Sequence, residues 1–542
     1  MKRILTFGLA LSICLAGCSA KNGTEPAPEA PKQTAAASQE EEGRYDSTLT
    51  VSMVRYVSSA MEAALAKTEK GETAEENRYN ELFRDKLNIE IDYDWISSDS
   101  NYIEKVDMAL AASNIPDFMA VTASQVKQLY EADLIWDMTD IYENYASEAA
   151  RTNMEMEGDS TFRAVTYDGK LMAIPSTWSS YGSAQFLWIR QDWLKNLGLP
   201  EPTCMEDVVK IAYAFAQQDP DQNGSSDTTG LGVQQDLTAS VGGLKGFFNG
   251  YGTYIGTWIT DTEDRITYSD IQPDVQAVLG QLNKMYEDGV IARDFGTTNA
   301  DGLISKLTAG SCGMFYGEHW MSLNLQACRD MDPEADWRPY PIVGLTPNSV
   351  PKNQIEVGTT YYWVASKQCA NPEAIMKMMN LMWDLDAYYK SSEDAEEAWW
   401  FSPIWVQNPR INLEQWENVQ KLLAGEEGNT EEQRWKQIEA YQDGDNSQWG
   451  IWMIYGDPDC SMSVLDAYLE KDMLLYSAFS GAPTKTMAAN GAVLDSLRDT
   501  EFTRMITQGN ISGTFESFVQ NWNQMGGEQM TQEVTDRMRD QQ

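Results

Sequence analysis

The sequence has very few histidines and few basic side chains. Its 542 residues include one histidine, His319, and 40 Lys and Arg against 82 Asp and Glu, which gives a formal net charge of -42. A single histidine excludes zinc sites built from two or three imidazoles, and a Ser-His-Asp triad would depend on that one residue. Because clustered Lys and Arg bind phosphate groups, the charge argues against nucleic acid, an anionic lipid surface and a polyanionic substrate. A neutral ligand fits this composition best.

Cysteine pairs and long apolar runs are also scarce. Two of the seven cysteines, Cys14 and Cys18, lie near the start, and the other five show no C-x-x-C spacing. An odd number of scattered thiols argues against a disulfide framework or a metal cluster, although a pairing of Cys312 with Cys328 stays open. No segment beyond residue 18 has the 18 or more apolar residues that a membrane-spanning helix needs.

The first residues indicate where the protein is sent. A basic start precedes a largely apolar stretch, residues 4–15, which suits a secretion signal but is too short to cross a bilayer. Small residues before Cys18 then resemble a bacterial lipobox, so we expect residues 1–17 to be a lipoprotein signal peptide and Cys18 to carry the lipid. Residues 18–46 are rich in Ala, Pro and Glu and should form a flexible linker. The expected location is the extracellular face of the cell membrane, or the periplasm, with the lipid on Cys18 as membrane anchor.

Apolar periodicity predicts an α/β fold. Leu49, Val51 and Met53 alternate with polar residues, as in a strand, and residues 89–95 alternate in the same way after a helical stretch at 75–86. A strand, a helix and a second strand in this order predict a parallel pair, because a crossover helix joins parallel neighbours. The evenly spaced Met and aromatic residues of later helices are expected to form cores rather than cofactor contacts.

Several landmarks, taken in order, resemble one family. They include Leu134-Ile135-Trp136-Asp137-Met138, Asp168-Gly169-Lys170, Ile189-Arg190-Gln191-Asp192-Trp193-Leu194 and Gly526-Gly527. Over residues 47–540 the chain resembles the family 1 extracellular solute-binding proteins of carbohydrate ABC importers, in particular the branch that includes alginate-oligosaccharide-binding lipoproteins. The resemblance implies an α/β, two-lobed periplasmic-binding-protein-like fold of the class II type, with a hinge and a ligand enclosed between the lobes.

The resemblance also implies how the chain is divided. Both lobes are expected to be discontinuous, because the chain would cross between them near residues 175–180, 315–320 and 366–371. The expected N-terminal lobe consists of residues 47–176 plus 316–366, and the expected C-terminal lobe consists of residues 177–315 plus 367–542.

The implied function is that of a non-catalytic, monomeric receptor. It would capture a neutral oligosaccharide and pass it to the permease subunits of an ABC transporter. A uronate polymer such as alginate would need several cationic partners, and basic residues are scarce, so that substrate is not carried over. Two alternatives stay open: a secreted glycoside hydrolase, which needs only two suitably spaced carboxylates, and a peptide-binding lipoprotein.

One loop has the spacing of a calcium site. Starting at Asp219, oxygen-bearing side chains recur at alternate positions, with Gly224 at the sixth, turn position. The twelfth position is Gly230 rather than Glu, so Thr228, another group or water would have to complete the shell. The resembling alginate binders carry a similar loop with bound calcium, whereas an acidic surface turn is the simpler alternative. The expected ligands of a structural calcium ion are Asp219, Asp221, Asn223, Ser225 and Asp227.

Aromatic residues are abundant, with 18 Trp and 25 Tyr. Sugar rings stack on indole and phenol rings, while their hydroxyl groups need carboxylate, amide or guanidinium partners. Trp320 is the strongest candidate because the resembling proteins stack sugar on a Trp soon after a Gly-rich stretch; any candidate could instead belong to a core or to the surface. The expected ligand contacts are Trp95, Trp178, Tyr181, Trp320, Tyr361, Tyr362, Trp363, Trp399 and Trp400, with Asp117 and Arg190 as polar partners.

Overall fold

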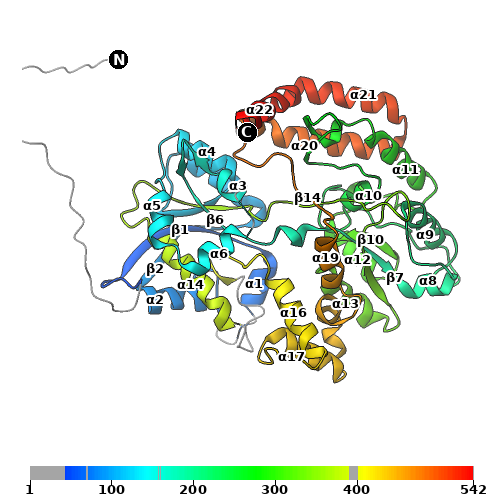
Figure 1. Ribbon diagram of the computed structural model, residues 1–542, viewed down its shortest axis with the longest axis horizontal. Helices are drawn as coiled ribbons and strands as arrows, with labels where there is room; N and C mark the ends of the chain where they lie inside the picture. Colours follow the sequence, from blue (N-terminus) through cyan, green and yellow to red (C-terminus); the bar gives the residue numbers. More distant parts are fainter. Residues whose placement is uncertain are drawn as a thin grey trace, which may run out of the picture. The chain divides into compact units, whose positions relative to one another are not determined.

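The computed structural model describes residues 43–66, 68, 71–156, 158, 160–389 and 401–540 (Figure 1). The predicted signal peptide, Cys18 and nearly all of the predicted linker lie outside the described residues, as do Trp399 and Trp400. Within the described ranges, no helix is long and apolar enough to cross a membrane. The fold is mixed α/β, as the periodicity predicts, and its buried apolar side chains form two cores.

The first core surrounds a five-stranded sheet. Strand β1 (Leu49–Val57) pairs in parallel with β2 (Ile89–Ser98) at the sheet edge and with β3 (Phe118–Val121), the central strand. Strand β13 (Tyr362–Ala365) is antiparallel to both β3 and β6 (Ile174–Pro175), so a segment far along the chain completes this sheet.

Helix α2 (Arg78–Leu87) precedes β2 and supplies the crossover, which confirms the predicted strand, helix and strand. Its start is fixed by Asn77, whose side-chain oxygen accepts a hydrogen bond from the Tyr79 amide at 3.0 Å. The other helices that contribute to this core are α1 (Ser59–Leu65), α3 (Asp99–Ala111), α4 (Ala123–Glu131), α5 (Thr139–Tyr145), α6 (Glu148–Glu155) and α14 (Ala374–Tyr389). Short elements near it are α7 (Ser160–Arg163), β4 (Thr166–Tyr167) and β5 (Lys170–Leu171).

The second core surrounds an antiparallel sheet in the order β10 (Met314–Gly317), β7 (Phe186–Arg190), β11 (Trp337–Tyr340). All residues of β7 are buried, because this central strand is covered on both faces. Two short pairs accompany the sheet: β8 (Trp258–Thr260) with β9 (Ile266–Tyr268), and β12 (Asn353–Gln354) with β14 (Leu474–Leu475).

Most of the described helices pack around this second core, and in Figure 1 the orange helix α20 lies beside the red helices α21 and α22. The helices are α8 (Gln191–Leu197), α9 (Met205–Gln217), α10 (Lys245–Gly250), α11 (Val275–Glu287), α12 (Ala300–Thr308), α13 (Met321–Met331), α16 (Ile411–Leu423), α17 (Gln433–Gln442), α18 (Trp449–Ile451), α19 (Ser461–Glu470), α20 (Lys485–Gln508), α21 (Ile511–Trp522) and α22 (Glu528–Asp540).

The structure distributes two segments differently from the predicted division into lobes. Buried residues between 316 and 355 belong to the second core, because β10 pairs with β7 and the apolar face of α13 packs beneath it. Buried residues between 367 and 404 belong to the first core, because α14 packs against α5 and α6. The chain therefore passes between the cores at residues 175–183, 356–361 and 405–412, which we call the first, second and third crossing segments.

Hydrogen bonds join the three crossing segments to one another. The Trp178 amide donates to the Gly358 carbonyl at 2.7 Å, and the Gly358 amide donates to Ser180 Oγ at 2.7 Å. The Gln407 amide donates to the Thr177 carbonyl at 3.2 Å. A Cβ atom on Gly358 would lie 1.9 Å from the Trp178 carbonyl oxygen, so only glycine permits this close approach.

Candidate ligand-binding site

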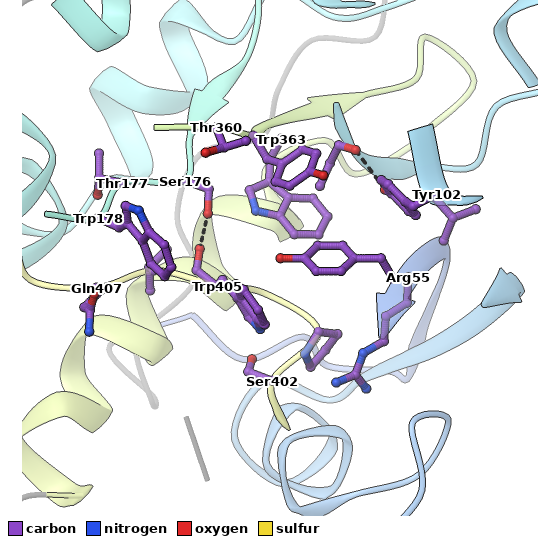
Figure 2. A pocket seen from close by; sticks show the side chains of 16 residues that line it. Arg55, Tyr102, Ser176, Thr177, Trp178, Thr360, Trp363, Ser402, Trp405 and Gln407 are labelled. Carbon is purple, nitrogen blue, oxygen red and sulfur yellow. Dashed lines mark hydrogen bonds between the residues drawn. The ribbon is translucent and has the colours of Figure 1, made fainter. Parts of the chain in front are cut away.

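A cavity with a volume of about 120 Å³ opens where β1 and β3 end and the crossing segments meet. Open α/β sheets bind ligands at the carboxyl ends of their strands, and Tyr56 stands near that end of β1. Figure 2 shows Trp178, Trp363 and Trp405 around the cavity. We call it the aromatic pocket; its aromatic lining consists of Tyr56, Tyr102, Trp178, Tyr361, Trp363 and Trp405.

The rings of the aromatic pocket support one another. The Tyr56 ring centroid lies 5.3 Å from that of Tyr102, 5.4 Å from that of Tyr361 and 5.2 Å from that of Trp405. Trp178 is stacked near Trp405, with centroids 6.4 Å apart and an interplanar angle of 18°, and 43% of Trp178 is exposed. Because these contacts restrain the rings before any ligand arrives, little rotamer entropy remains to be lost on binding.

Two buried polar atoms in this pocket have no hydrogen-bond partner among the described residues. They are Thr177 Oγ1 and Trp363 Nε1, and both residues line the cavity. Among the described lining residues the one cation is Arg55, whose buried guanidinium donates to the carbonyl oxygens of Ala74 and Phe401. The pocket therefore offers flat apolar faces and uncharged polar groups.

Two polar cavities of about 440 Å³ and 640 Å³ lie beside the second core and share several lining residues. The second crossing segment connects them to the aromatic pocket along the chain, since Glu356 lines both polar cavities and Tyr361 lines the aromatic pocket. The charged residues that line one or both polar cavities are Asp236, Lys245, Asp301, Glu318, Glu356, Asp495, Arg498 and Asp499.

The two cations of the polar cavities are both paired with carboxylates. Lys245 Nζ forms an ion pair with Glu356, and Arg498 lies 3.2 Å from Asp495 and 2.9 Å from Asp499. Carboxylates outnumber the two cations in this lining, so the cavities carry a net negative charge. A negatively charged ligand would be repelled here.

Two neighbouring residues after β10 have strongly shifted pKa values. Glu318 Oε2 accepts a hydrogen bond from Trp320 Nε1 at 2.7 Å, and burial raises the pKa of the Glu318 carboxyl to about 7 despite this bond and the nearby Lys245. His319 is buried, and its Nε2 lies 3.2 Å from Asn412 Nδ2. Burial lowers the pKa of the His319 imidazole to about 4, while the Gly182 backbone offsets part of that effect.

The structure brings three of the predicted aromatic contacts together, because Trp178, Tyr361 and Trp363 all line the aromatic pocket. Trp95 packs on Tyr102 with ring centroids 5.5 Å apart, one layer behind the pocket wall. Tyr362 is buried, next to Trp363 on β13, without lining this pocket, and Tyr181 packs against the second core. Trp320 lines none of the three cavities; its indole N–H donates a hydrogen bond to Glu318, which lines the larger polar cavity.

The predicted polar partners Asp117 and Arg190 line neither the aromatic pocket nor the two polar cavities. Asp117 Oδ2 accepts hydrogen bonds from the Ser52 amide at 2.8 Å and its hydroxyl at 3.1 Å, which ties β3 to β1. The Arg190 guanidinium is buried over Trp193 and pairs with Asp192 at 2.6 Å. Both side chains therefore hold the fold together.

The sequence pattern did not point to Tyr56, Tyr102 and Trp405, nor to the polar residues Glu318 and Lys245. Tyr56 carried a usable signal, since it stands near the end of the first predicted strand. Trp405 carried none, because only the packing of the third crossing segment brings it beside Tyr56.

The predicted calcium loop is folded by its own side chains. Asp219 accepts hydrogen bonds from the amides of Asn223 and Gly224, both at 3.1 Å. Burial, together with Asp219 and Asp227, raises the pKa of the Asp221 carboxyl, so the acidic groups crowd one another. The Asn223 amide group donates to Asp221 at 2.8 Å.

Other features of this loop fit a metal ion less well. Thr228 Oγ1 donates to the Phe215 carbonyl at 2.6 Å, so this hydroxyl is already engaged. Among the described residues, no group of three or more His, Cys, Asp or Glu is placed to hold a metal ion. The loop therefore brings acidic side chains close together, and the calcium site stays a prediction.

These two cores, joined by three crossing segments that carry the aromatic pocket, define the two-lobed fold of periplasmic binding proteins. Residues 65–401 match the family described as bacterial extracellular solute-binding protein, and the chain belongs to this family. It is 27% identical to the polygalacturonan/rhamnogalacturonan-binding protein YtcQ of Bacillus subtilis, over 44% of this chain and 46% of that protein. It is 24% identical to lipoprotein LipO of the same organism, over 47% of this chain and 49% of that protein. The matches thus span about half the length of these relatives.

Solved structures show the same fold at low sequence identity. The Streptococcus pneumoniae ABC-transporter substrate-binding protein FusA in complex with kestose superposes with a TM-score of 0.63 at 13% identity, covering 91% of this chain and 100% of that chain. Alginate-binding protein AlgQ2 without calcium ion superposes with a TM-score of 0.61 at 13% identity, covering 92% of this chain and 99% of that chain. The predicted fold class is confirmed.

Proposed function

We propose that this protein is a receptor that binds an oligosaccharide without altering it and delivers it to the permease subunits of an ABC importer. The observation that carries the proposal is the aromatic pocket, where restrained rings and two described residues with an unpartnered polar atom line one cavity. Stacking faces combined with a few convergent polar groups are what a sugar ring requires. The names of YtcQ and FusA support carbohydrate as the ligand class.

The charges around the site support a neutral oligosaccharide. Arg55, the cation among the described residues of the aromatic pocket, donates hydrogen bonds to backbone carbonyl groups. Both cations of the polar cavities form ion pairs with carboxylates. A uronate chain would find no unpaired cation in the lining of these three cavities, as far as the structure describes it, and would meet a surplus of negative charge. Neutral hydroxyl groups can instead donate hydrogen bonds to the carboxylates.

Calorimetry with a panel of neutral oligosaccharides, kestose among them, and with polygalacturonate tests the proposal. We expect binding of one neutral class, weaker binding by more than about tenfold in Trp178→Ala and Tyr361→Ala, and no binding of polygalacturonate. Tyr145→Ala is the matched control, since 43% of Tyr145 is exposed outside the three cavities. Recovered glycans should be unchanged; shortened products would instead support a hydrolase, and affinity only for peptides would support a peptide receptor.

A lipid on Cys18 would hold this receptor at the outer face of the membrane, and LipO, a matched relative, is named a lipoprotein. One acyl-modified cysteine followed by an Ala-, Pro- and Glu-rich linker would allow the folded part to move near the membrane. In membrane fractionation we expect wild-type protein to sediment with membranes and Cys18→Ser to be released. Equal sedimentation of both proteins would exclude the anchor.

Calcium binding at the loop from Asp219 to Asp227 is a second proposal. It is supported by the alternate oxygen-bearing residues and by the crowded carboxylates. The ion would be held by Asp219, Asp221, Asn223, Ser225 and Asp227 and would stiffen the connection that follows α9. Chelation should lower the melting temperature of wild type and of Glu427→Ala, an exposed control, but not of Asp221→Ala. An unchanged melting temperature in every protein would remove this site.

A further inference from the structure

Glu318 occupies a distinctive place in the larger polar cavity. It directly follows β10, and its carboxyl group lines the cavity of about 640 Å³. Trp320 Nε1 fixes one oxygen, Oε2, at 2.7 Å. The other oxygen, Oε1, receives no hydrogen bond from the residues that the structure describes. The carboxyl group is therefore held in place through Oε2, while Oε1 can still form a hydrogen bond.

Of the charged residues that line this cavity with Glu318, all but Lys245 carry carboxyl groups. Asp236 precedes α10, Asp301 lies in the first turn of α12, and Glu356 belongs to the second crossing segment. Lys245 on α10 is the cation among the described residues that line this cavity, and it already forms an ion pair with Glu356. A sugar hydroxyl can donate one hydrogen bond to these carboxylates. Donors for the lone pairs of its oxygen come from neutral lining residues such as Gln235, Ser240 and Asn299, or from a protonated carboxyl group.

We propose that Glu318 is a specificity-determining residue that donates a hydrogen bond from its protonated carboxyl group to an oxygen atom of the bound oligosaccharide, with Trp320 as its positioning residue. This inference rests on the proposed function and adds one oriented donor to the lining of the acidic cavity. A protonated carboxyl group has one O–H donor, which an ionised carboxylate does not. The indole of Trp320 keeps Oε2 an acceptor, so Oε1 is the oxygen that carries the proton toward the cavity.

The pKa of Glu318 makes this role pH-dependent. Burial raises it to about 7, with Lys245 opposing and Glu356 adding to the shift, so near neutrality the group is divided between its two forms. If only the protonated form binds, apparent affinity follows the protonated fraction and falls by about tenfold from about pH 6 to about pH 8. Oligosaccharide binding should also take up a proton in this range.

Calorimetry of wild type, Glu318→Gln (E318Q) and Glu356→Gln (E356Q) with kestose, or with the neutral oligosaccharide that binds best in the panel, tests the inference at both pH values. E318Q keeps an N–H donor in a side chain of similar shape, so it should bind at about pH 6 with wild-type affinity and lose the pH dependence. E356Q is the matched control from the same cavity and should keep most of the pH dependence. Glu318→Ala should bind about tenfold or more weakly at both pH values.

The outcomes separate this inference from the proposed function. If a sugar binds and E318Q retains the wild-type pH dependence, the role of Glu318 is wrong while the receptor function stands. If E318Q binds weakly at both pH values while folding normally, an ionised carboxylate is the true partner and the inference is overturned. If no oligosaccharide binds any of these proteins, the proposed function fails, and the ligand role of Glu318 fails with it.

Discussion

His319, the only histidine of the chain, provides a sharp test of how the second core meets the crossing segments. Its carbonyl oxygen accepts a hydrogen bond from Ser461 Oγ at 2.9 Å, and its Nε2 lies 3.2 Å from Asn412 Nδ2. A Cβ atom on Gly182, in the first crossing segment, would lie 3.6 Å from its Cε1 atom. Burial in this position lowers the pKa of the imidazole to about 4.

The sign of the pH effect follows from this lowered pKa. An unfolded chain titrates histidine near about 6.5, so between about pH 4 and about pH 6.5 the unfolded state binds more protons than the folded state. The free energy of unfolding therefore falls as the pH falls through this window, and the loss is complete below the folded pKa. At about pH 5 the contribution of His319 is a loss of about 2 kcal/mol relative to about pH 7.5.

Two measurements check this value. With isotopically labelled histidine, one imidazole resonance reports the pKa directly, because no other histidine is present. Urea unfolding of wild type and His319→Gln at about pH 5 and about pH 7.5 should show that acidification costs the wild type about 2 kcal/mol more than the variant. A midpoint near about 6.5, or equal losses in both proteins, would show that the imidazole is solvated and would refute the reasoning.

Three further substitutions test other contacts. Gly358→Ala should lower the free energy of unfolding by about 2–5 kcal/mol, because the methyl group collides with the Trp178 carbonyl; a loss under about 1 kcal/mol in urea unfolding would contradict this packing. Thr177→Val keeps the side-chain shape and removes an unpartnered hydroxyl, so stability should not fall while oligosaccharide affinity drops about fivefold; unchanged affinity would mean that the hydroxyl meets no ligand. Arg190→Met should lower the free energy of unfolding by about 2–4 kcal/mol, because Asp192 loses its partner, and should leave the Kd of the folded protein unchanged.

Local order was predictable from the sequence where it depends on neighbouring residues. The alternation from Leu49 to Met53 identifies β1, and the helical stretch predicted at residues 75–86 corresponds to α2, before any long-range contact is known. The fold class and the aromatic character of the site also followed, since three of the predicted rings line the aromatic pocket.

Pairing between distant strands was not predictable in the same way. The apolar pattern of the strand that begins at Met314 is compatible with either sheet. Its pairing with β7 places the buried residues between 316 and 355 in the second core. Arg190 illustrates the same limit for the site. An arginine in a sequence with many acidic residues has many possible ion-pair partners, so its role cannot be read from the sequence. Its buried contacts with Trp193 and Asp192 show that it stabilises the core.

The second crossing segment links the electrostatic and aromatic parts of the site. Glu356 pairs with Lys245 of the second core, and five residues later Tyr361 packs on Tyr56 of the first core. A ligand that contacts both Glu356 and Tyr361 would contact both ends of the second crossing segment. The backbone of this segment is hydrogen-bonded to Trp178 through Gly358. A ligand shifts the equilibrium between two conformations only by the difference between its affinities for them. A ligand that contacts one end of the second crossing segment would therefore change the conformation of the crossing segments less than a ligand that contacts both ends. Under the proposed function, this geometry favours an extended oligosaccharide over a single sugar.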